Sequence, residues 1–491
     1  MRVLKFGGTS LSHPHRLDTV ARRVKKLRAD GPVVVVVSAL GGVTDELTAV
    51  LDASRRGEPA PGLRRRLRAL HLEDPEKRLD RRAAAQLGDE LDRWLRELDG
   101  LIEGIARLGE APRGAIHRLL ATGERLSAPR AAAWLRAAGV DATVVDGTRL
   151  LRADYDLSEP RSAPPRIDAQ ATRRSVLDGL DGLIRGEVPV VTGFIGGDVH
   201  GRTVTLGRGA SDLSATTLAA ALQADAVEIW SDTDGVLNAD PRRVPGAEPL
   251  RELSFAQAAA LARYGAKVLH PETLEPVRRA ALPVILRSTF QPEAAGTRLV
   301  ETETGTRTEA RPATAPSPKA LAATTLAVTR LEMRSAPAAP LASQALAVLE
   351  RCTVAPLALT CGHGRLELWL RAADAEALEA PLRRQLRPLG GVLRRHGESA
   401  AVALLPASPS ATALLADLSR CLGQHGLAVK ALFVDRVEGS GTFSDEPNGP
   451  ELAVAVVDPG AADLALRAAH GSLVAPGPGL EACDMDVAAS G

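Results

Sequence analysis

The residues best suited to chemistry lie in one glycine-rich stretch, 191–215, VTGFIGGDVHGRTVTLGRGASDLSA. Its glycines stand at positions 193, 196, 197, 201, 207 and 209. Glycine accepts positive φ angles and lets backbone approach a ligand closely. Among the last glycines and after them stand a guanidinium, Arg208, a hydroxyl, Ser211, and a carboxylate, Asp212. The stretch therefore offers a cation for a carboxylate and a carboxylate for an amine or metal, although it also fits a plain glycine-rich hairpin.

The residues that follow predict a helix, SDLSATTLAAAL, with Ser211 as its N-cap. A helix N-terminus presents free N–H groups and a partial positive charge, which favour anions. The same bend could therefore bind a phosphate group.

A second glycine turn opens the chain. MRVLKFGGTS predicts a strand at Val3–Phe6 that runs into Gly7 and Gly8, with Lys5 at the rim. Strand, glycine turn and helix form a phosphate-binding arrangement, but the lysine precedes the glycines and the pattern is not a Walker motif. Only seven lysines occur in the chain, beside many arginines, so each lysine is of interest.

The elements that must position these residues alternate between strand and helix. The five valines Val33–Val37 predict a strand that is buried on both faces and therefore central and parallel. Ser38 and Thr44 follow at its carboxyl end, where ligands bind in open α/β sheets. Glu124 is expected at or near a helix start, where a carboxylate usually only compensates the helix dipole. The alternation continues through residues 1–300 and predicts a doubly wound α/β domain.

The chain changes character after residue 300. Residues 301–319 are polar and contain prolines, which predicts a linker. Short strands and helices then predict two α+β modules of similar size, 320–398 and 399–475, with the first strand segment shared between them. Residues 476–491 have few apolar side chains and are predicted to form a flexible tail.

Composition narrows the function classes. A chain of 491 residues has room for about two to four domains. Its net charge of +1 argues against nucleic-acid binding. No apolar run approaches membrane-spanning length, and the first residues lack a signal-peptide pattern. The four cysteines are scattered, so we expect a reducing compartment and a cytoplasmic protein without membrane or nucleic-acid partners.

Seven motifs, in order and with matching spacing over the first 300 residues, resemble the aspartate kinase family. They are KFGGTS at 5–10, VSALGGVTDEL at 37–47, GERLS at 123–127, GFIG…GRTVTLGRGASDLSA at 193–215, SDTDGVLNADPR at 231–242, SFAQAAALARYGAKVLHP at 254–271 and STFQPEAAGT at 288–297. The resemblance implies an open, mainly parallel amino-acid-kinase-like sheet sandwich over 1–300 as the catalytic domain. Residues 320–475 are more loosely similar to that family's paired ACT (ferredoxin-like) modules.

The resemblance also implies roles for individual residues. Lys5 would neutralise the transferring phosphoryl group, beside the Gly7 and Gly8 amides. Arg208 would bind the substrate α-carboxylate in a bidentate fork. The other implied substrate contacts are Glu124 and Asp212 for the α-ammonium, Ser38 and Thr44 for the β-carboxylate, Phe194 as a pocket wall, and Ser211. Implied nucleotide contacts are Lys5, Gly8, Ser231, Asp232, Leu237, Arg242 and Lys267.

The chain departs from the family pattern at five of these motif positions. Asp45 stands in place of asparagine, Ala210 of glycine, Leu213 and Leu237 of tyrosine, and Gln257 of glutamate. Ala210 adds a Cβ beside the reacting phosphate and would cost about 1 kcal/mol or more if that residue needs a positive φ. None of the five changes removes a charged group with an implied chemical role.

The activity implied by the resemblance is ATP-dependent phosphorylation of the L-aspartate β-carboxylate, with Mg²⁺ on the ATP phosphates. This is the first step toward lysine, threonine and methionine. Two alternatives remain at this point: a related kinase acting on another carboxylate in a specialised pathway, or a non-catalytic regulatory paralogue. ACT-like modules usually pair through their sheets, which implies a homodimer or a higher homo-oligomer.

We predict that lysine and threonine, alone or together at millimolar concentration, inhibit this activity less than twofold. The family pattern for an effector loop, a methionine followed by Gly-Phe, is replaced here by the sequence MRSAPAAPL at 333–341. Pro337 and Pro340 each remove a backbone donor that an amino-acid pocket would use. Initial rates with and without the two amino acids measure this, and cooperative inhibition by either would contradict it.

Overall fold

The computed structural model describes residues 1–475 except 59, 160–164, 208, 267, 270, 302–317, 335–338, 353, 363–364, 390, 408–409 and 437–449. Most of the predicted linker, part of the predicted effector loop and the whole predicted tail therefore lie outside the described residues. Two compact units are present: residues 1–236, 251–255 and 269–303 form the first, and the remaining residues form the second.

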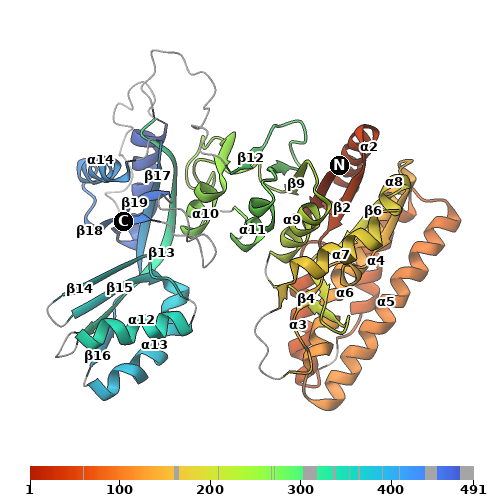
Figure 1. Cartoon of the computed structure of the whole chain (residues 1–491), viewed down its shortest axis with the longest axis horizontal. Helices are drawn as coiled ribbons and strands as arrows, with labels where there is room; N and C mark the ends of the chain where they lie inside the picture. The colour runs from red at the N-terminus through yellow and green to blue at the C-terminus, as the bar shows by residue number, and fades with distance from the viewer. Residues whose placement is uncertain are drawn as a thin grey trace, which may run out of the picture. The chain divides into compact units, whose positions relative to one another are not determined.

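The first unit is built on an eight-stranded sheet (Figure 1). In spatial order its strands are β10 (Glu252–Ser254), β12 (Thr297–Val300), β11 (Val284–Ser288), β9 (Ala226–Ser231), β1 (Arg2–Phe6), β2 (Val33–Val37), β6 (Val188–Thr192) and β3 (Ala142–Val145). All neighbouring pairs are parallel except β11 with β12. The predicted mainly parallel α/β fold is confirmed, and all five residues of β2 are buried, as expected of a central strand.

Helices cover both faces of this sheet. The helices of the unit are α1 (Gly8–Leu11), α2 (Pro14–Asp30), α3 (Val43–Arg55), α4 (Leu63–Glu76), α5 (Arg81–Leu108), α6 (Arg113–Ala137), α7 (Ala169–Leu180), α8 (Leu183–Gly186), α9 (Ala210–Leu222) and α11 (Pro271–Arg279). One continuous core joins α2–α6 to alternate residues of β1 and β2, including Leu4 and Val35. On the other face α9 contacts β1 and β2, and α7 and α11 pack against α9 (Figure 1).

The start of α9 differs from the prediction. Gly209, not Ser211, is the N-cap residue, and its φ of 70° lies in the left-handed region. The helix begins at Ala210, so Ser211 is already its second residue. The prediction of Ser211 as N-cap was wrong because a left-handed glycine turns the chain into the helix two residues earlier.

The long connection 147–170 is more ordered than a loop. It contains a 3₁₀ turn, η1 (Gly147–Arg149), and a two-stranded pair, β4 (Ala153–Asp154) with β5 (Arg166–Ile167). A second two-stranded pair, β7 (Ile195–Gly197) with β8 (Thr203–Thr205), forms a hairpin within the glycine-rich stretch. The first pair follows β3 in the chain and the second follows β6, and an isolated bridge joins Arg152 to Gly197.

The second unit is an antiparallel α+β structure. Its sheet order is β14 (Ala358–Gly362), β15 (Arg365–Arg371), β13 (Ala320–Arg334), β17 (Ser399–Pro406), β19 (Glu451–Val457) and β18 (Val429–Arg436), with β16 (Val392–Arg395) pairing β13. Strand β13 pairs with β17 through Ala320–Val328 and with β15 through Val328–Arg334. Helices α12 (Ala339–Arg351) and α13 (Ala372–Leu386) pack on one half, and α14 (Ala411–Gln424) and α15 (Ala462–Ala469) on the other.

Two segments of the predicted catalytic domain belong to this second unit. They are residues 237–250 and 256–268, the latter including most of α10 (Phe255–Arg263). The contact-defined units therefore do not follow the predicted division at residue 300, which remains a prediction for the functional domains.

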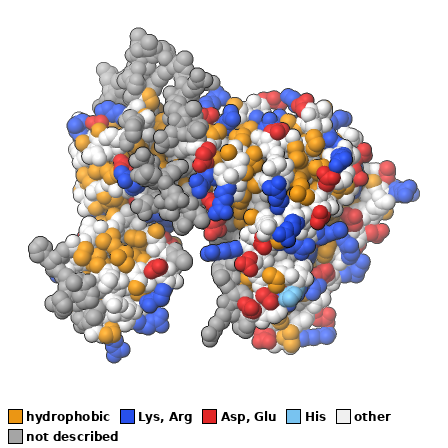
Figure 2. Space-filling model, in the orientation of Figure 1, with side chains coloured by type: hydrophobic (Ala, Val, Ile, Leu, Met, Phe, Trp, Pro, Cys, Tyr) orange, Lys and Arg blue, Asp and Glu red, His pale blue; other side chains and the backbone are white. Residues whose placement is uncertain are grey.

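The surface of the first unit carries both signs of charge. On the face that Figure 2 shows, Lys and Arg side chains are interspersed with Asp and Glu, in keeping with the net charge of +1. Within the described residues, no helix combines the length and the apolar character needed to cross a bilayer.

The start of α9 gives a stability prediction. Gly209→Ala should lower the free energy of unfolding by about 1–2 kcal/mol, because an L side chain is disfavoured at φ 70°. Ala210→Gly, one residue on, should cost about 1 kcal/mol or less, because Ala210 has helical backbone and no strain to relieve. Urea unfolding of both variants measures this; a larger cost at position 210 than at 209 would contradict it.

Candidate functional site

The predicted site residues follow the carboxyl ends of four adjacent strands. Gly7 comes directly after β1, Ser38 after β2, Gly193 after β6, and Ser231 ends β9. Because β9, β1, β2 and β6 are neighbours and parallel, these ends meet at one edge of the sheet. This is the edge at which open α/β sheets bind their ligands.

A largely buried ion pair joins two of the predicted catalytic residues, Lys5 of β1 and Asp212 of α9. The Nζ atom of Lys5 lies 2.6 Å from Oδ1 of Asp212, and only 11% of the lysine side chain and 20% of the aspartate side chain are exposed. Lys5 points from β1 toward the face that α9 covers, and Asp212 stands in the first turn of α9. A buried ammonium group is stable only with such a partner. The structure thus brings together two residues that are 207 positions apart.

The turn after β1 needs its glycines for close packing. The Gly7 amide donates to the Trp230 carbonyl at the end of β9, at 3.1 Å. A Cβ on Gly8 would lie 2.4 Å from the Ala39 carbonyl oxygen and 2.7 Å from the Gly41 amide nitrogen. Any side chain at position 8 would therefore push the β1 turn away from the turn after β2.

Hydroxyl groups join that second turn to its neighbours. Ser211 donates to the Ser38 hydroxyl at 3.3 Å, and Ser127 of α6 donates to the Ser38 carbonyl at 2.6 Å. Thr44 lies in the first turn of α3, half-buried. Ser127 belongs to the GERLS motif but was given no role from sequence, because nothing in the motif shows which neighbour a helical serine contacts.

Glu124 lies in the interior of α6, not at a helix start. The helix begins eleven residues earlier, at Arg113, so the interpretation of Glu124 as a dipole-compensating carboxylate was wrong. Its side chain is buried, and Oε1 accepts from the Ala39 amide at 3.0 Å, while Oε2 has no hydrogen-bond partner among the described residues. Burial raises the pKa of Glu124 from 4.5 to about 8, against the Ala39 amide and the Lys5 ammonium, which lower it. A buried carboxyl with a free oxygen is suited to bind a cationic group.

Phe194 has an unusual backbone. Its φ is 67°, uncommon for a non-glycine residue, and its amide donates to the Ser214 hydroxyl of α9 at 3.1 Å. The preceding residue, Gly193, packs so closely that a Cβ there would lie 2.9 Å from that of Ser211. Phe194 is half-buried between β6 and β7.

The predicted nucleotide residues are only partly placed. Ser231 contacts the Thr233 hydroxyl at 3.0 Å, and Asp232 beside it is exposed. Leu237 and Arg242 belong to the second unit, where Arg242 is ion-paired with Asp240 at 2.6 Å. Arg208 and Lys267 lie outside the described residues, so their predicted roles remain predictions.

The fold and this arrangement define a class of protein. A lysine at a glycine turn, a helix N-terminus and a buried carboxyl at one edge of a parallel sheet are suited to moving an anionic group onto an anionic, amine-bearing acceptor. Residues 1–288 match the amino acid kinase family, and the chain belongs to that family.

Within it, the chain is similar to aspartokinases. It is 37% identical over 298 residues to the lysine-sensitive aspartokinase 3 of Escherichia coli K12, covering 60% of this chain and 63% of that one. It is 31% identical over 308 residues to a bifunctional aspartokinase/homoserine dehydrogenase of Haemophilus influenzae, covering 60% and 36%. The chain therefore spans between about a third and two thirds of the length of these curated relatives. The crystal structure of E. coli aspartokinase III with aspartate and ADP superposes with a TM-score of 0.74 at 25% identity, covering 96% of this chain and 99% of that one.

The pKa of Glu124 gives a pH-dependent prediction. The folded protein keeps a proton on Glu124 up to about pH 8, whereas the unfolded chain loses it near pH 4.5, so this residue destabilises the fold progressively as pH rises between those values. Glu124→Gln should therefore gain stability relative to the wild type as pH rises from 5 to 8, by roughly 1–4 kcal/mol. Urea unfolding at several pH values measures the difference, with Glu110→Gln, an exposed site, as control. A difference that does not change with pH would contradict the shift.

Proposed function

We propose that the chain is an aspartate kinase, which transfers the γ-phosphoryl group of ATP to the β-carboxylate of L-aspartate. The observation that carries the proposal is the buried carboxyl of Glu124, with one oxygen free, beside the Lys5–Asp212 ion pair. The names of the aspartokinase relatives support the same substrate.

The charged side chains of the proposed site are suited to bind an α-amino dicarboxylic acid. The α-ammonium group of aspartate would bind the free oxygen of Glu124, and this contact would favour the ionised carboxylate over the protonated one. Asp212 would contribute a second negative charge while it holds the Lys5 ammonium in place. The α-carboxylate would pair with Arg208, and the β-carboxylate would lie near the hydroxyls of Ser38 and Ser211 and near Thr44.

The chemical step is an in-line displacement. A β-carboxylate oxygen forms a bond to the γ-phosphorus while the bond from that phosphorus to the β–γ bridging oxygen breaks, and ADP leaves with the electron pair. Lys5 and the Gly7 and Gly8 amides would stabilise the charge on the transferring oxygens. The product is an acyl phosphate, 4-phospho-L-aspartate.

Magnesium would enter as part of the nucleotide. Among the described residues, no group of three or more His, Cys, Asp or Glu side chains lies close enough to hold a metal ion. Mg²⁺ commonly keeps several waters and binds substrate phosphates, and we infer that it would bind here in that way. Its contribution when bound is to neutralise phosphate charge.

The wider setting is part of the same proposal. We infer a cytoplasmic enzyme that supplies the aspartate-derived amino acids lysine, threonine and methionine. The antiparallel sheet of the second unit fits ACT-like modules, and a homodimer through these modules is the expected assembly. Size-exclusion chromatography with light scattering measures the assembly.

The test of the function is ATP-dependent hydroxamate formation in the presence of hydroxylamine, which traps acyl phosphates. We expect product from L-aspartate, much less from L-glutamate, and little from N-acetyl-L-aspartate, which lacks the ammonium group that Glu124 would bind. Product from another carboxylate in preference to aspartate would favour a related kinase of a specialised pathway. No product from any carboxylate would favour a non-catalytic paralogue.

Lys5→Ala should lower kcat about a hundredfold or more and leave a folded protein. Removing one preorganised donor from a developing negative charge typically costs about 2.7–4 kcal/mol in the transition state. Lys26→Ala, at an exposed position of α2, is the matched control and should keep wild-type kcat. Turnover of the Lys5 variant close to that of the control would remove Lys5 from the mechanism.

A further inference from the structure

In the chain, the β7–β8 hairpin lies between two parts of the predicted amino-acid pocket, Phe194 before it and the first turn of α9 after it. Phe194 enters it and Leu206 leaves it, and the Leu206 amide donates to the Phe194 carbonyl at 2.9 Å to close its base. The chain continues from Leu206 through residues 207–209 into α9, which carries Asp212. The position of the hairpin therefore affects the two segments that flank it, Phe194 on one side and the chain leading into α9 on the other.

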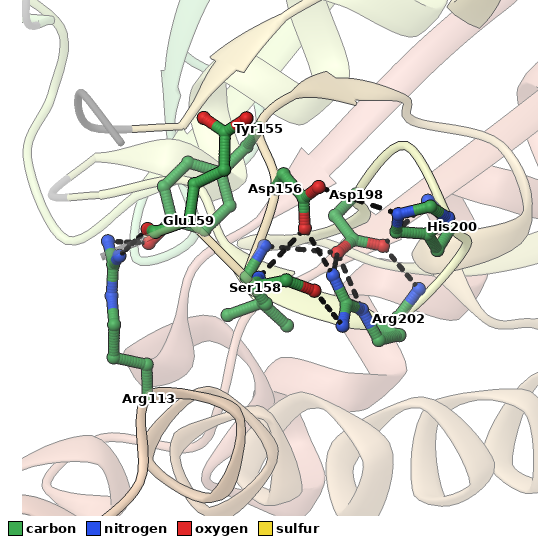
Figure 3. Close-up of polar contacts among 9 residues, drawn as sticks. Arg113, Tyr155, Asp156, Ser158, Glu159, Asp198, His200 and Arg202 are labelled. Carbon is green, nitrogen blue, oxygen red and sulfur yellow. Dashed lines mark hydrogen bonds and ion pairs between the residues drawn. The ribbon is translucent and has the colours of Figure 1, made fainter. Parts of the chain in front are cut away.

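Ion pairs hold the tip of the hairpin to the segment 153–158 (Figure 3). Asp198 is buried and accepts from the His200 and Arg202 amides at 3.0 and 2.8 Å and from Nε of Arg202 at 2.8 Å. Arg202 extends to Asp156 at 2.6 Å and to the Ser158 hydroxyl at 2.9 Å. The tip is thus tied to its neighbour by charged hydrogen bonds.

Helix α6 holds the first residue of strand β8, next to the tip of the hairpin. A terminal nitrogen of Arg125 donates to the Thr203 hydroxyl at 2.8 Å, while its Nε donates to Asp146 at 2.9 Å and the guanidinium lies over the Trp94 ring. Arg125 is buried and directly follows Glu124 in the chain. One helix thus supplies the proposed ammonium ligand and a contact to the hairpin.

His117, two turns earlier in α6, binds the last residue of β8. The Thr205 amide donates to Nδ1 of His117 at 3.1 Å, and the Thr205 hydroxyl lies 2.9 Å from the same nitrogen. Because an amide can only donate, Nδ1 is the accepting nitrogen and carries no proton. Burial and the nearby Arg113 guanidinium lower the pKa of His117, and the Tyr155 ring packs edge-on against the imidazole. Arg113 itself contacts the Tyr155 hydroxyl and the Glu159 carbonyl (Figure 3).

We propose that His117 and Arg125 are positioning residues for the amino-acid substrate, acting by holding β8 and so the loop that leads from it into α9, which carries Asp212. This rests on the proposed function, because the loop matters only if it meets an amino acid. Thr203 and Thr205 are two residues apart in β8, so their side chains lie on the same side of the strand, and both contact α6. The loop begins at the next residue, Leu206, and reaches Gly209, the N-cap of α9, three residues later. Loss of either contact therefore affects the amino-acid side of the site.

The contact to His117 has a defined pH dependence. A proton on Nδ1 replaces the acceptor with a donor that faces the Thr205 amide, so the contact is present when the imidazole is neutral. Because the pKa is lowered, the contact is complete at neutral pH and is lost as pH falls through that pKa. Among the described residues, the charged or titratable groups that face the ring are Arg113 and Tyr155, and the Arg113 charge further disfavours protonation.

Two substitutions of His117 test the proposal by steady-state kinetics. His117→Phe keeps ring size but leaves the Thr205 amide without its acceptor, and should raise the KM for aspartate about five- to tenfold with the KM for ATP changed less than twofold. His117→Asn places an oxygen near the position of Nδ1 and cannot be protonated in this range. It should keep the wild-type KM at neutral pH and lose the rise in aspartate KM that we expect of the wild type on acidification.

Thr203→Val removes the acceptor of Arg125 and should raise the aspartate KM in the same selective way. Thr143→Val is its matched control, because Thr143 is a half-buried strand threonine on β3 that contacts Glu187 and not the hairpin. An unchanged aspartate KM in both His117→Phe and Thr203→Val, or an equal rise in both KM values, would overturn the proposal. If His117→Phe fails to fold, Thr203→Val and His117→Asn decide it.

Hydrogen exchange separates this proposal from the proposed function. At one fixed neutral pH, the peptide containing residues 203–207 should exchange faster in His117→Phe than in the wild type and in His117→Asn. Equal exchange in all three proteins would overturn the holding role whatever the activity. If the wild type makes no hydroxamate from aspartate, the proposed function and the substrate-positioning role fail together, and faster exchange would then support only the holding of β8.

Discussion

A lysine ammonium group at the end of a buried central strand must have a negative partner, and this requirement shapes the site. Asp212 supplies that partner at 2.6 Å, from the first turn of a helix that lies across the same strand. The N-terminus of α9 must therefore sit beside the end of β1. The left-handed Gly209 makes this possible, since it turns the chain into the helix within one residue. The ion pair, the glycine turn and the helix N-terminus are thus structurally coupled. Gly209 places the start of α9 beside β1, and this position allows Asp212 to pair with Lys5.

Helix α6 is the second organising element. Its interior carries Glu124 toward the turn after β2, Ser127 toward the Ser38 carbonyl, and Arg125 toward β8. Gly123 and Pro129 lie in the middle of this helix, and Gly123 has a packing reason. A Cβ on Gly123 would lie 2.7 Å from that of Ala39, so only glycine allows α6 to approach the turn closely enough for Glu124 to reach its amide. Burial of a carboxyl and close backbone packing are therefore coupled here.

How far the sequence predicts this structure depends on how local each signal is. The five valines of β2 and the glycines after β1 act over a few residues, and both elements were predicted correctly. Glu124 was misplaced because Gly123 and Pro129 suggest helix ends, and the contacts that override them come from distant residues. Ser211 was predicted as a cap on side-chain type alone, whereas the backbone conformation of Gly209 decided the boundary. The family resemblance assigned Lys5 and Asp212 to one site, but neither it nor any local pattern predicted the ion pair between them.

Nothing in the sequence indicated that residues 237–250 and 256–268 belong to the second unit. Buried polar contacts help to hold these two segments there. The Asn238 carbonyl accepts from the Ala323 amide of β13 at 2.8 Å, and its side-chain oxygen contacts the His470 ring at 3.1 Å. Tyr264, fully buried after α10, donates to Asp435 of β18 at 2.8 Å, and Arg263 pairs with the same carboxylate. Burial raises the pKa of Asp435, so a lone carboxylate there would be costly, and the tyrosine and arginine are what stabilise its charge. The two segments that carry Leu237, Arg242 and Lys267 thus depend on the C-terminal sheet for their buried partners. The strands of the C-terminal sheet are consequently constrained, because they complete the packing of segments that the resemblance assigns to the nucleotide.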